Sequence, residues 1–265
     1  MNHKILIIAC LCFSCKTVPV TGRKELNLVP NFLIQSMSFS QYDAVLQSSP
    51  VMPASDAGAQ MVRRVGTRIQ HAVENYMNQN GFGKELNGFK WDYNLINQNI
   101  VNAWCMPGGK VVVYEGLLPV TQNETALAIV LGHEIGHAIA RHGNERMSQA
   151  LLVQLGGLTL EEALKQKSQQ TQAIFLGLYV VGANLGVLLP HSRLQESEAD
   201  KLGLIFAAMA GYDPDEAVLF WQRMAAASKG NKIPEFLSTH PSDATRIKRL
   251  SALIPEVKQK YYQPQ

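Results

Sequence analysis

The sequence predicts an α+β fold that is mostly helical and carries a small β-sheet. Apolar residues recur at helical spacing from Met61 to Tyr76, which is typical of a helix with one buried face. From Phe89 to Leu95, apolar and polar residues alternate instead, which predicts a strand. Two apolar runs, Val101–Cys105 and Lys110–Tyr114, flank a Pro-Gly-Gly segment, so they predict two strands joined by a tight connection.

The rest of the chain has helical patterns. The segment Thr121-Gln122-Asn123-Glu124 resembles a capping box, and Gly143 is placed to end the helix that this box starts. Further helices are predicted over Met147–Leu155, Leu160–Leu189, Ser192–Ala210, Pro214–Ala227 and Ser242–Leu253. The apolar stretch Ala173–Leu189 is short for a membrane span and contains three glycines, so a buried helix is favoured over a membrane segment.

Composition and charge indicate one folded domain. The chain has 265 residues, of which 46% are hydrophobic and 17% charged, so it can bury one sizeable core. The net charge is +3 and the basic residues are scattered, which argues against a nucleic-acid-binding surface. We expect the domain to span residues 41–257 and residues 258–265 to form a C-terminal tail.

The first residues are typical of an export signal. Lys4 precedes an apolar run that is too short to span a bilayer and ends with Ser14 before Cys15. This pattern resembles a bacterial lipoprotein signal, in which residues 1–14 are removed and Cys15 is lipidated. Cys10 is a competing acceptor, and ordinary secretion is the simpler alternative. The prediction is a lipoprotein on the periplasmic face of the envelope, by default at the outer membrane, with residues 15–40 as an extended tether.

Cysteine usage restricts the possible metal ligands. Three of the four cysteines lie in the signal region, so Cys105 is the one that remains in the body of the mature chain. An internal disulfide and a cysteine-based zinc site are therefore excluded, and any metal must be held by histidines and carboxylates.

The segment His133-Glu134-Ile135-Gly136-His137 carries the strongest chemical signal. Residues four apart in a helix lie on one face about 6 Å apart, so both imidazoles can reach one ion. Glu134 lies beside them and is suited to accept a proton from a water molecule that zinc has activated. Such a pattern would arise by chance in about one chain in a hundred of this composition. It predicts two metal ligands and a general base.

Together with other segments, this motif resembles one enzyme family. The matching segments are His133–His142, Ser192–Asp200, Leu237–Pro241 with Arg246, and Asn102–Gly109. They are similar to the gluzincin metallopeptidases related to HtpX and the CAAX prenyl proteases, family forty-eight of the metallopeptidases. The resemblance covers essentially the whole mature domain and implies a zincin fold. A zinc hydrolase needs a third protein ligand and an open position, and the resemblance assigns Glu196 as that ligand.

Acidic and histidine residues near these ligands are interpreted by their helical positions. Asp200 lies one turn after the third ligand and is expected to accept the free ring N–H of a ligand histidine, which we assign as His133. Glu198 is interpreted as a solvated acid. His142 would point off the ligand face by about 140° in a continuous helix, so it is assigned a structural role.

Two further elements are placed near the zinc by the resemblance. His240, in a loop, is expected either to stabilise the oxyanion of the transition state or to act as a fourth metal ligand in a resting state. An edge strand beside the active-site helix pairs with substrate in gluzincins, so Asn102 or Ala103 could present backbone groups to a peptide. The alternative for these two residues is a plain core strand.

The predicted function is that of a metalloendopeptidase with one zinc ion per chain. Its expected substrates are unfolded or misfolded proteins of the cell envelope, and its expected membrane contact is the lipid anchor. The alternatives are a chaperone-like or binding lipoprotein whose zinc is structural, and an integral membrane protease in which Ala173–Leu189 is inserted. No pattern in the sequence indicates an oligomeric state.

Overall fold

The structure, a computed structural model, describes residues 15–155, 192–227, 234–240 and 244–264. The predicted signal peptide and the predicted helix Leu160–Leu189, which includes the apolar stretch Ala173–Leu189, lie outside these described residues. Among the residues that are described, no helix is long and apolar enough to cross a membrane.

The described elements form a mostly helical α+β fold with two small sheets, as predicted. The helices are α2 (Asn31–Ser48), α3 (Ala57–Gln79), α4 (Leu118–Thr121), α5 (Glu124–Ile139), α6 (His142–Leu155), α9 (Arg193–Met209), α10 (Glu216–Ala227), α11 (Glu235–Thr239) and α12 (Ala244–Tyr261), with short 3-10 turns η1 (Gly83–Leu86) and η2 (Glu115–Leu117). The strands are β1 (Cys15–Thr17), β2 (Lys24–Leu26), β3 (Asp92–Ile96), β4 (Ala103–Met106) and β5 (Lys110–Tyr114).

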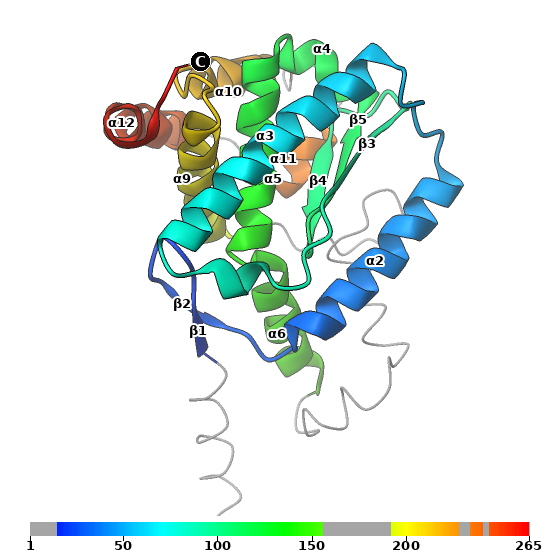
Figure 1. The fold of residues 1–265 in the computed structure, drawn as a ribbon, viewed down its shortest axis with the longest axis vertical. Helices are drawn as coiled ribbons and strands as arrows, with labels where there is room; N and C mark the ends of the chain where they lie inside the picture. The colour runs from blue at the N-terminus through cyan, green and yellow to red at the C-terminus, as the bar shows by residue number, and fades with distance from the viewer. Residues whose placement is uncertain (1–14, 156–191, 228–233, 241–243, 265) are drawn as a thin grey trace, which may run out of the picture.

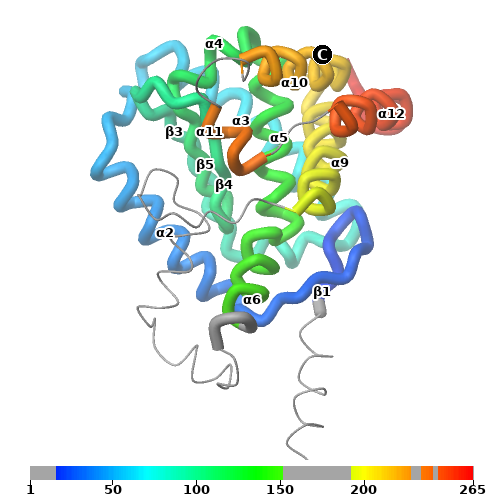
Figure 2. Tube along the Cα trace, turned by 180° about the vertical axis from the view of Figure 1, so that it is seen from behind, coloured from blue at the N-terminus to red at the C-terminus, as the bar shows by residue number. Residues whose placement is uncertain are grey.

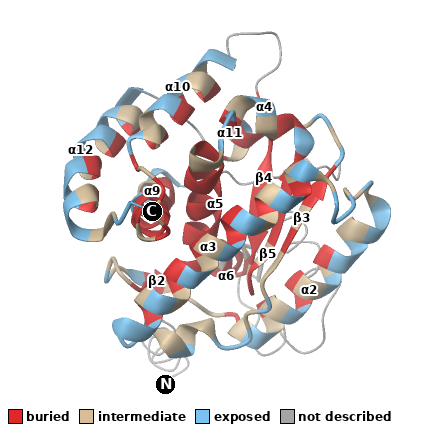
Figure 3. Cartoon of the chain, turned by 45° about the horizontal axis from the view of Figure 1, so that its top comes forward, coloured by how far each residue is buried: buried red, intermediate tan, exposed pale blue. Residues whose placement is uncertain are grey.

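Helix α5 lies at the centre of the molecule (Figure 1). It packs against α9 and α3, and β4 of the sheet also lies against it. The view from behind shows α11 close to α5 and the sheet (Figure 2). Every residue from Ala126 to Ile139 is buried, whereas the outer faces of α10 and α12 are exposed (Figure 3). Because α5 is buried on all sides, the surrounding elements hold it rigidly, and it is a firm support for the polar side chains that it carries.

The larger sheet has the strand order β3-β5-β4. Strand β3 pairs with β5 in parallel, and β4 pairs with β5 antiparallel. Gly108 and Gly109 make the connection between β4 and β5 with φ angles of +87° and +84°, which glycine adopts without a steric penalty. Among the described strands β4 is at the edge of this sheet, and it is the strand that contacts α5.

The contact between α5 and α9 depends on glycines. A Cβ atom at Gly132 would lie 2.7 Å from the carbonyl oxygen of Gly203, and a Cβ atom at Gly203 would lie 2.7 Å from the backbone nitrogen of His133. Both distances are below van der Waals contact, and the atoms met are backbone atoms that cannot rotate away. The two helices therefore approach so closely because neither has a side chain at the crossing.

Replacing Gly203 with alanine is expected to lower the free energy of unfolding by about 1–3 kcal/mol, because the added methyl group must push α5 and α9 apart. Urea unfolding of the purified variant measures this loss. Lys201→Ala is the matched control, since Lys201 is an exposed residue on the same helix. A Gly203→Ala protein as stable as the control would show that the helices separate without cost.

The ends of α5 differ from the predicted ones. The N-cap is Asn123, whose side chain accepts a hydrogen bond from the backbone N–H of Ala126, so the predicted capping box at Thr121 is wrong. The helix ends at Ile139, before Gly143, because Arg141 adopts a left-handed φ of +54°. Its guanidinium is held by Glu25, Glu85 and the carbonyl of Thr17, which compensates for the strained backbone.

Both ends of the described chain contain more structure than expected. Residues 15–40 do not form an extended tether: they contain the β1–β2 hairpin and the first half of α2. The weak periodicity of α2 gave no clear helical signal, and three-residue strands are too short to recognise. At the other end α12 continues to Tyr261, beyond residue 257, because Val257 and Ile254 are buried on one face of that helix.

Candidate metal centre

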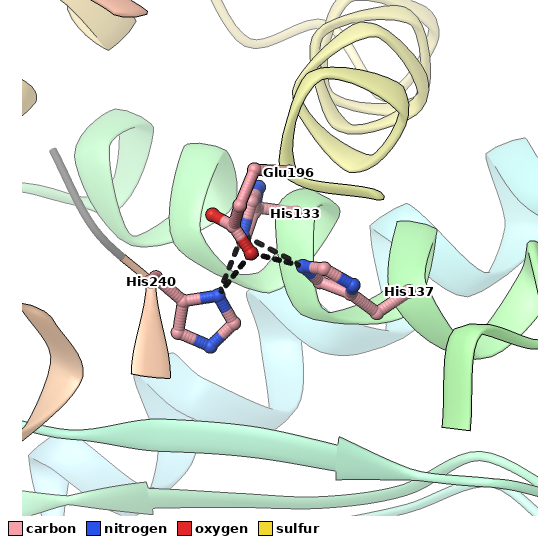
Figure 4. A group of neighbouring side chains, drawn as sticks. All are labelled: His133, His137, Glu196 and His240. Carbon is pink, nitrogen blue, oxygen red and sulfur yellow. Dashed lines mark hydrogen bonds and ion pairs between the residues drawn. The ribbon is translucent and has the colours of Figure 1, made fainter. Parts of the chain in front are cut away.

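Four side chains from three helical regions bring one donor atom each to a single point (Figure 4). The residues are His133, His137, Glu196 and His240, all buried, and their donor atoms lie within 4.8 Å of one another. The Nε2 atoms of His133 and His137 are 3.0 Å apart. The Nδ1 atom of His240 is 3.2 Å from Nε2 of His133 and 3.0 Å from Oε1 of Glu196.

Local structure explains why these side chains meet. His133 and His137 lie one turn apart on α5, as their spacing predicts. Glu196 is in the first turn of α9, because Ser192 caps that helix and forms a capping box with Gln195. His240 directly follows α11. The amide of Phe236 in this helix donates a hydrogen bond to the carbonyl of Val101, just before β4, and so holds α11 beside the sheet.

The donor set fits a zinc ion. Tetrahedral zinc has bonds of about 2.0–2.1 Å to nitrogen and oxygen, which places neighbouring donors about 3.3 Å apart. The distances above, and the 3.3 Å between Nε2 of His137 and Oε1 of Glu196, match this spacing. Asp200 lies at Nδ1 of His133 and His142 lies at Nδ1 of His137. With a proton on each Nδ1 atom, both Nε2 atoms would be free to bind a metal ion at the centre of the group.

Glu134 lies beside this donor group and reaches the same cleft. Its Oε1 atom is 3.3 Å from Nε2 of His240. Burial raises the pKa of the Glu134 carboxyl above its ordinary value, although the nearby imidazoles partly oppose this shift. A raised pKa brings a carboxylate closer to the range in which a general base works best at neutral pH.

A buried arginine and aspartate support His133 and Glu196. Oδ1 of Asp200 is 3.0 Å from Nδ1 of His133, the contact expected from the position of Asp200 on α9. Arg246 makes two hydrogen bonds to Asp200, at 2.7 and 2.9 Å, and its Nη1 atom is 2.7 Å from Oε2 of Glu196. The guanidinium also lies 3.6 Å over the ring of Trp221. Burial alone would raise the pKa of Asp200, but Arg246 and His133 hold it below its ordinary value.

His142 and Glu198 also take part in this network, which the sequence analysis did not foresee. Nδ1 of His142 lies 2.7 Å from Nδ1 of His137, and Nε2 of His142 lies 2.9 Å from Oε2 of Glu198. The interpretation of Glu198 as a solvated acid is wrong, because its side chain is only 4% exposed. The 140° offset predicted for His142 assumed an unbroken helix, whereas the chain turns at Arg141.

The two residues proposed for substrate pairing line the cleft with Glu134, His137 and His240. The carbonyl of Asn102 accepts a hydrogen bond from the amide of Tyr114, so it is directed toward β5. Backbone groups alternate along an antiparallel strand, so those of Ala103 are directed toward the open edge. The amide of Ala103 donates to the side chain of Asn102 at 2.9 Å. Of these two residues, Ala103 is thus the one whose carbonyl is directed away from β5.

Two of the four cysteines, Cys15 and Cys105, lie among the described residues. Cys105 is a buried free thiol in β4, and no cysteine belongs to the donor group found among the described residues. Cys15 is the first residue of β1, directly after the part of the chain that is not described.

Comparison with known proteins gives a consistent assignment. The sequence profile "Peptidase family M48" matches residues 64–254, a span that contains all four donors. The mitochondrial metalloendopeptidase OMA1 of Schizosaccharomyces pombe is 32% identical over 246 residues, which are 92% of this chain and 67% of that protein. The mitochondrial metalloendopeptidase OMA1 of Bos taurus is 31% identical over 245 residues, 90% of this chain and 46% of that protein.

A bacterial relative is also similar over a shorter region. The beta-barrel assembly-enhancing protease of Yersinia pestis is 34% identical over 157 residues, which are 58% of this chain and 32% of that protein. The chain therefore spans between about a third and two thirds of the length of these relatives. The family profile covers most of the chain and includes the donor group described above. The chain belongs to peptidase family M48, whose members are zinc metallopeptidases.

Proposed function

We propose that this protein is a zinc-dependent metalloendopeptidase in which His133, His137 and Glu196 hold the metal and Glu134 is the general base. The observation that carries the proposal is the position of Glu134: its carboxylate lies at the donor group, in a cleft that also contains the open edge of β4. A structural zinc site would need neither a buried base nor an adjoining cleft.

The chemistry follows from this arrangement. Zinc bound at these donors supplies Lewis acidity, which polarises a carbonyl group and acidifies water. Glu134 accepts a proton from the attacking water and delivers it to the nitrogen of the leaving amine. The edge of β4 holds the substrate in an extended conformation through backbone hydrogen bonds, so the site accepts many side-chain sequences. Asp200 orients His133 by accepting a hydrogen bond from its Nδ1–H group.

The position of His240 supports its role as a fourth ligand in a resting state rather than as a stabiliser of the oxyanion. Its Nδ1 atom lies among the other three donors, so with zinc bound it would take the fourth position that a catalytic site leaves open for water. We expect His240→Ala to raise the basal rate of casein cleavage severalfold while zinc stays bound. A loss of about 10²-fold or more would instead indicate that His240 stabilises the transition state.

The proposed substrates are unfolded or damaged proteins of the cell envelope, met by an enzyme anchored through lipidated Cys15 at the outer membrane. The signal pattern around Cys15 and the bacterial relative named as a beta-barrel assembly-enhancing protease support this setting. The relatives named as mitochondrial metalloendopeptidases are compatible with the chemistry and not with this location. Cys15→Ala is expected to abolish radiolabelled palmitate incorporation, whereas Cys10→Ala is expected to preserve it; the reverse result would move the anchor to Cys10.

The activity itself is tested by zinc analysis and casein cleavage with the purified full-length chain. We expect one zinc per chain, cleavage of casein but not of a stably folded protein, loss of cleavage after chelation, and recovery when zinc is restored. Bound zinc with no cleavage of any unfolded substrate, even in the His240→Ala variant, would favour the alternative of a binding lipoprotein with a structural metal.

A further inference from the structure

The joint between α5 and α6 places a second histidine against a metal-ligand candidate. Arg141 turns the chain with a φ of +54°, and His142 consequently folds back onto His137. The two Nδ1 atoms are 2.7 Å apart, and the side chain of His142 is fully buried. The turn at Arg141 thus brings His142, the first residue of α6, into direct contact with the ring of His137.

The metal-donor atoms determine the direction of the two hydrogen bonds that His142 makes, one with His137 and one with Glu198. Since Nε2 of His137 faces the other donors, the proton of this ring belongs on Nδ1 and is donated to Nδ1 of His142. His142 must then carry its own proton on Nε2, from which it donates to Oε2 of Glu198 at 2.9 Å. Such an outer partner determines both the tautomer and the orientation of a ligand ring. His142 does for His137 what Asp200 does for His133.

Glu198 is in turn held by the turn of the N-terminal β1–β2 hairpin. Arg23 donates from Nε to Oε2 of Glu198 at 2.8 Å, and the hydroxyl of Thr21 donates to Oε1. Arg23 also makes two hydrogen bonds to Glu145 of α6, at 2.8 and 2.9 Å. Together with Nε2 of His142, the donors of Arg23 and Thr21 place three hydrogen bonds on the Glu198 carboxylate, which fixes it as the acceptor for His142.

The hairpin turn is built to present these two side chains. Val20 has a φ of +72°, which is rare for a β-branched residue and marks local strain. The turn is closed by a hydrogen bond from the amide of Val18 to the carbonyl of Arg23 at 2.8 Å. On the other side of the hairpin, Arg141 donates to Glu25 at 2.7 Å and to the carbonyl of Thr17 at 2.8 Å. The hairpin is thus bonded both to Arg141, which forms the joint, and to Glu198, which accepts the hydrogen bond from His142.

We propose that His142 is a positioning residue for His137, and that the β1–β2 hairpin completes the metal centre by holding Glu198 through Thr21 and Arg23. The inference rests on the proposed zinc site and adds a link from that site to the hairpin that follows Cys15. Zinc affinity depends, on this proposal, on a contact made by residues far from the ligands in sequence.

The test compares variants of the full-length chain for zinc affinity, measured by competition with a chromogenic chelator, and for the visible absorption spectrum of the cobalt-substituted protein. His142→Leu removes the acceptor, and His142→Asn restores an acceptor near the position of Nδ1. Arg23→Gln breaks the hairpin contact at a residue that is 18% exposed. Arg223→Gln is the matched control, because Arg223 is 23% exposed and pairs with Glu216 away from the centre.

His142→Leu is expected to weaken zinc binding by about 10- to 100-fold and to change the cobalt spectrum, while His142→Asn recovers part of the affinity, because it restores the acceptor for His137 but not the donor to Glu198. Arg23→Gln is expected to weaken zinc binding measurably more than Arg223→Gln does. The two metal-free variants are expected to unfold at the same temperature, so that the difference in zinc binding is not a difference in stability. If His142→Leu binds zinc like the parent, or if the two arginine variants bind alike, the inference fails although the zinc site stands. A parent that binds no zinc overturns the proposed function as well.

Discussion

Replacing Glu134 with glutamine is expected to lower casein cleavage by about 10²- to 10⁴-fold, the contribution typical of a general base. Zinc content is expected to stay at the parent level, because Glu134 is not among the four donors. Glutamine has nearly the same shape as glutamate and cannot accept the proton, so the change removes the chemistry and leaves the cleft. The measurement is kcat on casein together with zinc analysis of the same preparation.

Two companions make this result specific. Glu124→Gln introduces the same change on the same helix at a partly exposed residue that pairs with Arg64, and this variant is expected to cleave casein at the parent rate. His133→Ala is expected to lose both zinc and cleavage, because it removes a ligand. If kcat of Glu134→Gln on casein were within a factor of a few of the parent value, another group in the cleft would have to be the general base.

Replacing Arg246 with methionine is expected to lower the free energy of unfolding of the metal-free protein by about 3–5 kcal/mol. The side chain is 1% exposed and lies between the carboxylates of Glu196 and Asp200. Methionine fills much of the volume on Trp221 but leaves two buried negative charges without their partner. For a protein of this size, the loss corresponds to a decrease of about 6–20 °C in the unfolding temperature.

Urea unfolding of the chelated protein measures this effect without the compensating charge of zinc. Arg246→Lys is expected to be intermediate, since a lysine keeps the charge but cannot bond both carboxylates with the same geometry. Arg64→Met, at an exposed ion pair, is expected to leave the unfolding temperature unchanged. An Arg246→Met protein as stable as the parent would mean that the carboxylates are protonated or rearranged in the metal-free state.

The features of this protein that depend only on residues close in sequence could be predicted from the sequence alone. The spacing of His133 and His137 placed both rings on one face of a helix, and the two apolar runs that flank the Pro-Gly-Gly segment predicted the β4–β5 unit. The first interpretation follows from the repeat of a helix and the second from turn-forming residues, and both depend only on neighbours in the chain. The assignment of Glu196, by contrast, came from resemblance, because no local pattern relates it to a helix sixty residues earlier.

Only the tertiary structure decided that His142 and Glu198 also support the donors. The left-handed turn at Arg141 depends on partners from the hairpin and η1, and it brings His142 onto His137. The close crossing of α5 and α9 then decides the roles of the three acids on α9: Glu196 joins the donors, Asp200 reaches His133, and Glu198 reaches His142. Sequence alone determined the chemistry of the motif, because helix geometry is local. The residues that surround the motif could be identified only from the fold, because burial and long-range charge pairing bring together segments that are far apart in the sequence.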